Sequence, residues 1–324
     1  MEYKTYKLDG AEFITIRNRN FFEVTLCCVG ASIYEINHHF KTLTLTPSNV
    51  KDFLKPTSYY GKTLGRVAGR IAKGKIVING KHYFLAQNEN ENVLHGGYFG
   101  LSTQTFTPTI NILEDKAIVE FKYTSLDLES GFPGTLDVLV RYIILEKEDV
   151  LRIEYIAKSD KDTVLNLTNH VYFTLNETTN HNLLLKMNAD KFIYPDDKNL
   201  LPLEYKDVDE VFDFRDGLYF KDHIFDNALT NVKASGYDHM FISSNEDDHL
   251  LTLEGSKYIL DIHSSYKALQ MYSDNIIDNV PMKDTLNISH RGVALEPQLD
   301  QLGDINLKAY ENYNHYIEYR FGNK

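Results

Sequence analysis

Short segments in which apolar and polar residues alternate recur along most of the chain. In the N-terminal part they cover residues 13–16, 22–26 and 42–46, and they are rich in β-branched and aromatic side chains. Because successive side chains of a β-strand point to opposite faces, this period of two predicts strands with one buried face. Further alternating segments occupy much of residues 101–165 and 240–272. The sequence contains no convincing amphipathic helix of about twelve residues or more, so the pattern predicts an all-β protein.

The turn residues add detail to this prediction. Asn79-Gly80 separates two alternating segments, and both residue types readily adopt the positive φ angles that a two-residue hairpin turn requires. Residues 59–75 contain four glycines and are expected to form an irregular loop. Residues 176–235, which are rich in Asn and Asp, are expected to be looser than the strand-rich segments around them.

Many short strands joined by turns are typical of a large antiparallel β-sandwich, which is the fold class that we predict. The length of 324 residues would permit two domains, but large all-β proteins often fold as one unit. The sequence contains no linker, low-complexity tract or repeat of fixed period. We therefore expect residues 1–324 to form a single domain.

The segment 167–175 stands out among the predicted strands. One of its faces carries mainly apolar side chains, and the other carries a row of hydrogen-bonding side chains: Asn166, Thr168, His170, Tyr172 and Thr174. A polar row with an imidazole at its centre suits the floor of a cleft that binds a polar ligand. For this strand alone, a solvated face or a histidine held by its neighbours is the simpler interpretation.

The charge of the chain narrows the range of partners. Lys and Arg number 34 and Asp and Glu number 46, so the formal net charge is −12. Nucleic acids and anionic membrane surfaces require a basic face, so neither is an expected partner. No apolar segment approaches the length needed to span a membrane. The acidic balance better suits a neutral or cationic small molecule.

The two cysteines, Cys27 and Cys28, are adjacent. Neighbouring residues in an extended strand point to opposite faces, so we expect no disulfide between them. Two thiols also supply too few ligands for a zinc site. The N-terminal residues are polar and contain no apolar signal region. Together these features predict a cytoplasmic location.

Four further residues are candidates for a polar site. Arg70 lies in the glycine-rich segment, and a guanidinium can donate two parallel hydrogen bonds to a carboxylate or to hydroxyl groups. His95 precedes Gly96-Gly97, where the backbone can approach a ligand closely. Asp238 begins a predicted strand and can accept hydrogen bonds or orient an imidazole. Glu296 follows apolar residues, so burial would raise its pKa and make it a useful base.

Each of these candidates has a simpler interpretation when taken alone. A surface arginine, a histidine in a turn, an aspartate that caps a turn and an exposed glutamate are all common. His95 and His170 have no third ligand at metal-like spacing, so the sequence does not support a metal site.

Eight segments, taken together and in order, resemble the aldose 1-epimerase (galactose mutarotase) family. They are GRVAGRIA (65–72), NGK (79–81), NVLHGG (92–97), GFPG (131–134), LTNHVYF (167–173), DFR (213–215), GYDH (236–239) and ALEPQ (294–298). One segment such as LHGG would be a weak signal, but eight in family-like order and spacing across most of the chain are specific.

The resemblance implies a β-supersandwich that binds a small-molecule aldose in an open cleft and requires no cofactor. It implies Glu296 as the general base, His170 as the general acid, and Arg70, His95 and Asp238 as sugar-binding residues. In the implied reaction, the base takes the proton of the anomeric hydroxyl while the acid protonates the ring oxygen. The ring opens and recloses as the other anomer. A monomer or a homodimer is the expected assembly.

Two alternatives remain open. A hexose-6-phosphate mutarotase of the same fold would need a basic cluster for the phosphate, and the motifs contain no extra cluster. A non-catalytic sugar-binding module would retain Arg70 and Asp238 but lose the acid or the base, whereas both are present. Three departures from the family pattern, Thr174, Pro297 and Leu203, lie outside the five site residues and concern the choice of sugar. The sequence leaves that choice open between galactose, glucose and other aldoses.

Overall fold

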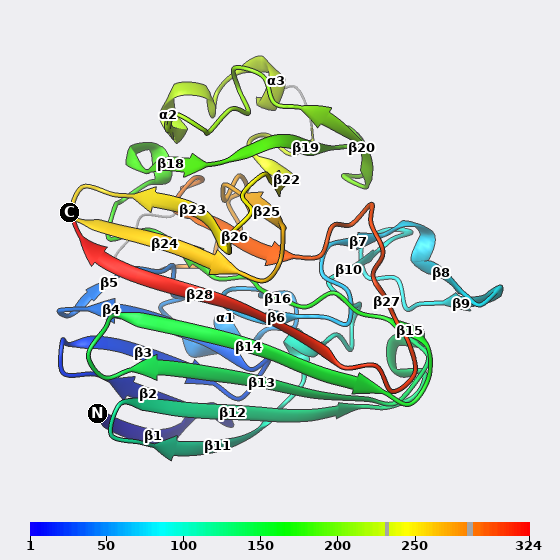
Figure 1. Ribbon diagram of the computed structural model, residues 1–324, viewed down its shortest axis with the longest axis horizontal. Helices are drawn as coiled ribbons and strands as arrows, with labels where there is room; N and C mark the ends of the chain where they lie inside the picture. The colour runs from blue at the N-terminus through cyan, green and yellow to red at the C-terminus, as the bar shows by residue number, and fades with distance from the viewer. Residues whose placement is uncertain (231–232, 284–287) are drawn as a thin grey trace.

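The computed structural model describes residues 1–230, 233–283 and 288–324 of the chain (Figure 1). About 49% of the residues lie in strands and 8% in helices, so the all-β class is confirmed. Within the three larger sheets, the described strand pairings are antiparallel. The predicted large antiparallel sandwich is confirmed as well.

Three sheets contain most of the strands. The five-stranded N-terminal sheet follows the sequence order β1 (Glu2–Leu8), β2 (Ala11–Arg17), β3 (Phe22–Cys27), β4 (Ser32–His38) and β5 (Lys41–Thr42). The nine-stranded sheet has the order β11 (Thr107–Ile112), β12 (Lys116–Ser125), β13 (Leu136–Leu145), β14 (Val150–Ser159), β28 (Tyr313–Asn323), β24 (Tyr258–Ser264), β23 (His249–Glu254), β18 (Leu184–Met187) and β21 (Leu218–Tyr219). The six-stranded sheet has the order β17 (Tyr172–Phe173), β26 (Val293–Gln298), β25 (Ala268–Tyr272), β22 (Asp238–Ser243), β19 (Ala189–Pro195) and β20 (Pro202–Asp207).

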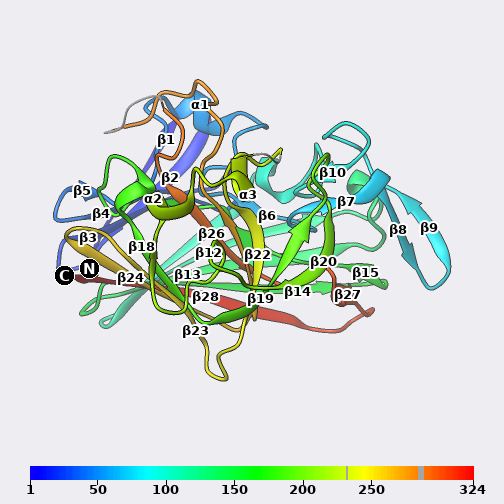
Figure 2. The same cartoon turned by 90° about the horizontal axis from the view of Figure 1, so that it is seen from above.

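Short strand pairs and short helices connect these sheets. The pairs are β6 (Thr63–Leu64) with β16 (Thr168–Asn169), β7 (Arg70–Ile71) with β10 (Val93–Leu94), β8 (Lys75–Ile78) with β9 (Lys81–Phe84), and β15 (Thr163–Val164) with β27 (Asn306–Leu307). The helices are α1 (Val50–Leu54), α2 (Phe220–His223), α3 (Asn227–Thr230), η1 (Ala72–Gly74), η2 (Leu101–Thr103), η3 (Glu129–Gly131) and η4 (Asn180–Asn182). No helix in the described ranges is long and apolar enough to cross a membrane. Figure 2, seen from above, brings α2, α3 and β19 to the front, with both termini at one end of the molecule.

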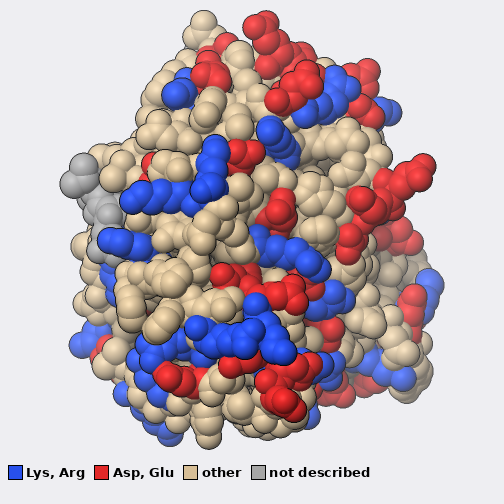
Figure 3. Space-filling view, turned by 60° about the vertical axis from the view of Figure 1, so that its left-hand side comes forward, with Lys and Arg blue, Asp and Glu red and all other residues tan. Residues whose placement is uncertain are grey.

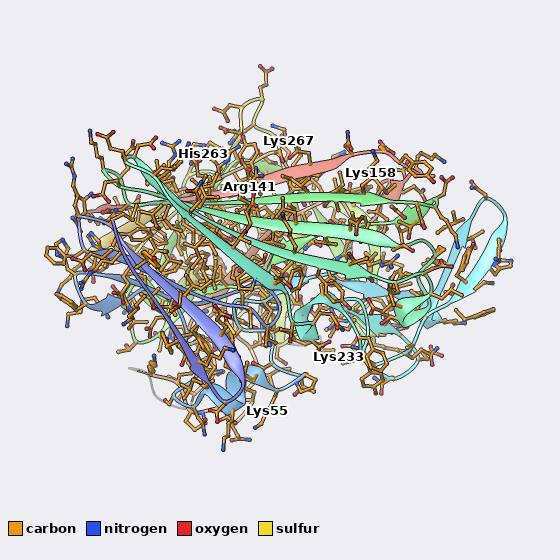
Figure 4. All side chains as sticks on the ribbon, turned by 90° about the horizontal axis from the view of Figure 1, so that it is seen from below. Lys55, Arg141, Lys158, Lys233, His263 and Lys267 are labelled. Carbon is orange, nitrogen blue, oxygen red and sulfur yellow. The ribbon has the colours of Figure 1, made fainter. Side chains whose placement is uncertain are left out.

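The two faces of the nine-stranded sheet follow from the alternation in its long strands. Val119 and Tyr142 lie in register across β12 and β13 and are fully buried on the inner face. On the outer face, Arg141 donates to Glu120 at 2.8 Å and to Glu154 at 2.9 Å. Figure 4 labels Arg141 over these strands, and Figure 3 shows that charges of both signs intermingle on another face. Such partly exposed ion pairs contribute about 0–1 kcal/mol each, so burial of the inner face is the main stabilising effect.

Two local expectations are confirmed. β8 and β9 pair across the Asn79-Gly80 turn, whose residues have φ angles of 50° and 75°. Both angles lie in the left-handed region that a two-residue hairpin turn requires, and the hairpin projects from the body of the molecule in Figure 1. Cys27 and Cys28 are both free and buried.

The continuous strand expected over residues 167–175 is wrong in part. β16 pairs with β6, whereas β17 pairs with β26, so the chain passes from one sheet to another between them. His170 lies at this crossing, where its N–H donates to the Lys62 carbonyl and its carbonyl accepts from the Gly61 N–H. All of residues 167–175 are buried, because packing covers both faces of this segment. The expectation of one exposed or cleft-lining face therefore does not hold along its whole length.

The segment 176–235 contains more strand than its composition predicts. β19 and β20 pair within the six-stranded sheet, and β18 and β21 extend the nine-stranded sheet. β20 lies at the edge of its sheet, and its residues are exposed or half-buried. An edge strand without a buried face lacks the alternation on which the sequence prediction depends, which explains why it was missed.

Candidate active site

All five residues singled out in the sequence line one pocket. The pocket measures about 350 Å³, which is within the range typical of small-molecule sites. Its polar members from the sequence are Arg70, His95, His170, Asp238 and Glu296. They come from five segments of the chain. The strands β7, β22 and β26 supply Arg70, Asp238 and Glu296, whereas His95 directly follows β10 and His170 lies between β16 and β17. The tertiary structure thus assembles the predicted set in one place.

A short antiparallel pairing brings Arg70 and His95 together. Arg70 opens β7 and lies opposite Leu94, the last residue of β10, so His95 follows directly. The His95 N–H donates to the Gly69 carbonyl at 3.0 Å, and the Gly69 N–H donates to His95 Nδ1 at 3.2 Å. Because Nδ1 accepts a hydrogen bond, neutral His95 carries its proton on Nε2. This atom is a donor for a hydroxyl group in the pocket.

Gly96 lets the loop after His95 pass directly against another part of the backbone. Its φ angle is 87°, and a Cβ at this position would lie 1.9 Å from the Gly65 carbonyl oxygen. Glycine is required here both for the positive φ and for the absence of a side chain.

We expect Gly96→Ala to lower the free energy of unfolding by about 3 kcal/mol or more, because the clash adds to the strain of positive φ. Gly80→Ala is the matched control, since Gly80 has a φ of 75° but a Cβ there meets no atom within 4 Å. The control should cost only about 1–2 kcal/mol. Urea unfolding measures both variants, and equal losses would contradict the importance of the close contact at Gly96.

Asp238 and Glu296 are carried by strands on either side of β25. Glu296 of β26 lies opposite Gln270 of β25, and Asp238 of β22 lies opposite Tyr272 of β25. Residues two apart on a strand share a face, so both carboxyl groups and the Gln270 amide point to the same side of the sheet. Gln270 Nε2 donates to Asp238 Oδ1 at 2.7 Å and fixes the orientation of this carboxylate.

His170 and Glu296 form a buried polar contact in the pocket. His170 Nε2 lies 3.5 Å from Glu296 Oε1, and the two residues are 6% and 2% exposed. The imidazole packs near the rings of Tyr172 and Tyr59, with centroid distances of 4.9 and 6.2 Å. His170 Nδ1 and Glu296 Oε2 have no hydrogen-bond partner within the described residues. Buried polar atoms are normally paired, and a catalytic role is one explanation for the exceptions.

Burial changes the acidity of these groups in opposite directions. Burial raises the pKa of Glu296 well above its ordinary value, and the charge of Asp238 adds to the rise while Arg70 opposes it. Burial lowers the pKa of His170 to about 4. The pKa of His95 is also lowered, by burial first and then by His170 and Arg70. Burial therefore shifts both members of the Glu296–His170 pair toward their uncharged forms.

Several lining residues were not assigned to the site from the sequence: Tyr59, Glu89, Gln270, Tyr272 and Gln298. Gln298 belongs to the ALEPQ segment, so attention to that motif would have identified it. Glu89 lies in a polar loop and Gln270 in an ordinary alternating strand, and neither has a local signal. These side chains meet the others only because the sheets pack against one another.

The polar row expected between residues 166 and 174 is only partly in the pocket. His170 and Tyr172 line it, whereas Thr168 is fully buried outside its lining. The Asn166 side chain instead donates to Gln298 Oε1 at 3.2 Å and to the Leu299 carbonyl at 3.1 Å. In the part of the chain that the structure describes, no group of three or more His, Cys, Asp and Glu side chains is arranged to hold a metal ion.

Comparisons with known proteins agree with this arrangement. Residues 12–320 match the sequence model of the family described as Aldose 1-epimerase. An aldose 1-epimerase of Haemophilus influenzae is 32% identical, and the alignment covers 97% of each chain. A galactose mutarotase of Sus scrofa is also 32% identical, with 83% of this chain and 80% of that protein covered.

A comparison with solved structures indicates the same family. A crystal structure of galactose 1-epimerase from Lactobacillus acidophilus superposes with a TM-score of 0.90 at 26% identity, and the superposition covers 99% of this chain and 98% of that one. The sequence match extends over nearly the whole chain and includes every segment that carries a polar residue of the pocket. This chain therefore belongs to the aldose 1-epimerase family of isomerases.

Proposed function

We propose that this enzyme interconverts the α and β anomers of an aldohexose, with galactose and glucose as the first candidates. The observation that carries the proposal is the 3.5 Å approach of His170 Nε2 to Glu296 Oε1 in a pocket lined by hydrogen-bonding groups. An acid and a base that face the same small volume can remove one proton and deliver another to a single bound molecule. The names of the relatives, aldose 1-epimerase and galactose mutarotase, support the same substrate class.

The proposed reaction begins with the cyclic sugar bound to the pair in its charged form. Glu296 as a carboxylate takes the proton of the anomeric hydroxyl, and His170 as an imidazolium protonates the ring oxygen. The C1–O5 bond breaks and leaves an open-chain aldehyde. Rotation about the C1–C2 bond presents the other face of the aldehyde, and the two residues then reverse their roles as the ring closes. No electrons are transferred, so the cycle is complete with these two proton carriers.

Burial favours the proton distribution of the open-chain step. After ring opening Glu296 is protonated and His170 is neutral, which is the arrangement that the raised pKa of Glu296 and the lowered pKa of His170 favour. The charged arrangement that binds the closed sugar is less stable in the same buried volume. The protein therefore stabilises the intermediate relative to the bound ring, which lowers the barrier to opening.

The remaining side chains are proposed to hold the sugar hydroxyls. Asp238 accepts hydrogen bonds, while Arg70 and His95 Nε2 donate them. A sugar hydroxyl group can therefore donate to Asp238 and accept from Arg70 or His95 at the same time. Gln270 keeps Asp238 in place from the neighbouring strand. These contacts orient C1 and the ring oxygen toward the Glu296–His170 pair.

The charges that line the pocket favour an uncharged sugar over a hexose 6-phosphate. Among the described lining residues, the cations are Arg70 and Lys233, and Arg70 is already bound by Glu89. Lys233 is exposed and is labelled in Figure 4. The carboxylates of Glu89 and Asp238 line the same pocket and would oppose a phosphate dianion. A non-catalytic sugar-binding module would need no acid–base pair, so the proximity of His170 and Glu296 in the pocket supports the catalytic proposal.

The organisation of the chain is part of the same proposal. A single domain over residues 1–324 is supported by one cluster of buried apolar residues that includes Ala11 and Phe321. A cytoplasmic location is supported by the free thiols of Cys27 and Cys28. A monomer or a homodimer is the proposed assembly, and mass measurement in solution distinguishes the two.

Purified protein is expected to accelerate the change in optical rotation of freshly dissolved α-D-galactose or α-D-glucose, because both proton carriers belong to the chain itself. Polarimetry with a panel of single anomers ranks the sugars, and hexose 6-phosphates serve as the competing class. Dialysis against EDTA should leave the rate unchanged. A rate no faster than spontaneous mutarotation for every aldose would refute the proposed function, and activity that returns only with a divalent cation would refute the acid–base mechanism.

A further inference from the structure

We infer that Glu89 is a positioning residue for sugar binding, because it holds the guanidinium of Arg70 with one nitrogen directed toward Asp238 and the sugar. This inference rests on the proposed function of the pocket. It goes further by assigning a role to a loop residue that no motif contains and that reaches the sugar through another side chain.

Two of the three nitrogens of the Arg70 guanidinium donate to Glu89, and the third faces Asp238. Nε donates to Glu89 Oε2 at 2.8 Å, and Nη2 donates to Glu89 Oε1 at 3.1 Å. Nη1 faces the opposite side and lies 3.8 Å from Asp238 Oδ2. A two-point contact between a planar guanidinium and a carboxylate fixes the plane as well as the position of the side chain. Glu89 thus occupies one edge of the fork and leaves Nη1 free to donate to a hydroxyl group beside Asp238.

The loop that carries Glu89 is tied to the strand opposite Arg70. The Asn88 side chain accepts from the Leu94 N–H at 2.7 Å and donates to the Leu94 carbonyl at 3.0 Å. The Asn92 N–H donates to the Glu89 carbonyl at 2.9 Å, which closes the turn. Leu94 is the residue paired with Arg70 across β7 and β10. The carboxylate and the guanidinium therefore belong to one locally braced unit, and their contact does not depend on a free loop.

The charge of Glu89 also acts on Asp238. Burial raises the pKa of Asp238, Arg70 and Gln270 oppose the rise, and the negative charge of Glu89 adds to it. Removal of that charge should lower the pKa of Asp238, so the loss of sugar affinity at acid pH should begin at a lower pH. A merely structural role for Glu89 would not move this midpoint.

Glu89→Gln tests the inference, because glutamine keeps nearly the same shape but has no charge and only one acceptor oxygen, so it cannot form the two parallel hydrogen bonds to Nε and Nη2. We expect KM for the preferred aldose to rise about tenfold while kcat changes little, as for the loss of one charge-assisted contact. The acid midpoint of sugar affinity should shift to lower pH. Glu89→Asp, which keeps the carboxylate, should restore part of the affinity. Glu91→Gln is the matched control, since Glu91 is an exposed carboxylate in the same loop and outside the pocket lining.

Thermal unfolding of each variant checks that the fold is retained. If Glu89→Gln and Glu91→Gln both bind sugar as the wild type does, the positioning role is overturned while the proposed function stands. If Glu89→Gln lowers kcat and leaves KM unchanged, the inference is also overturned. If the wild-type protein fails to catalyse mutarotation of any aldose, the proposed function and this inference fail together.

Discussion

Replacing Glu296 with glutamine is expected to lower kcat for mutarotation by about 100-fold or more, the scale of a lost acid–base group. Glutamine keeps the shape of the side chain and its hydrogen bonds but cannot accept the proton of the anomeric hydroxyl. The carboxyl group lies 3.5 Å from His170, and Glu296 is 2% exposed, so the substitution removes a buried acceptor at the reacting pair. A folded Glu296→Gln protein with near wild-type kcat would refute the assigned base.

The pH dependence of this variant provides an independent measurement. The reactive pair carries one proton, and the wild-type rate should fall toward pH 4 as His170 is protonated beside protonated Glu296. The rate should also fall on the alkaline side, where Glu296 loses its proton at a pKa raised by burial. Such a profile of kcat/KM is bell-shaped. In Glu296→Gln the fall in residual kcat/KM at alkaline pH should disappear. If the fall remains unchanged, the ionisation that causes it belongs to another group.

The same substitution should not destabilise the protein. The folded state binds the proton of Glu296 more tightly than the unfolded chain does, because its pKa is raised. Ionisation therefore costs the wild type stability as the pH rises above the ordinary value of 4.5. Glutamine does not ionise, so urea unfolding near pH 8 should find the variant as stable as the wild type or more stable. This unfolding measurement shows whether a lower kcat comes from the missing proton acceptor or from a destabilised protein.

Replacing His170 with asparagine is expected to lower kcat by a similar factor of about 100 or more. Asparagine can donate a hydrogen bond but cannot deliver a proton to the ring oxygen. The imidazole Nε2 lies 3.5 Å from Glu296 Oε1, so the substitution removes the proposed proton donor from the contact with the proposed base. Polarimetry with the sugar that the wild type prefers measures the loss.

The double variant tests whether the two residues act on one transition state. If they do, the loss in the Glu296→Gln, His170→Asn protein should be far smaller than the product of the two single losses. If the two residues contributed independently, the loss in kcat of the double variant would equal the product of the two single losses. Unfolding measurements on all three variants are needed, because His170 lies at the crossing between two sheets and its backbone is hydrogen-bonded to Gly61 and Lys62.

Local patterns were sufficient for much of the fold and for the members of the site. The Asn79-Gly80 turn and the alternating strands depend on residues next to one another in the chain, so the sequence predicts them directly. The family motifs, taken in order, point to Arg70, His95 and Asp238, and all three line the pocket. The pairing of β7 with β10 brings Arg70 next to His95, and the packing of the sheets brings Asp238 to the same pocket.

What the sequence determined by itself was therefore the strand content, the tight turn, the family and the five polar residues. The interruption at His170, the edge strand β20 and the contact between Arg70 and Glu89 depended on how the sheets pack. The direction of the His170 pKa shift was likewise decided only in three dimensions. The physical reason is that burial and hydrogen-bond partners are properties of neighbours in space, and these neighbours come from segments with no local signal in common.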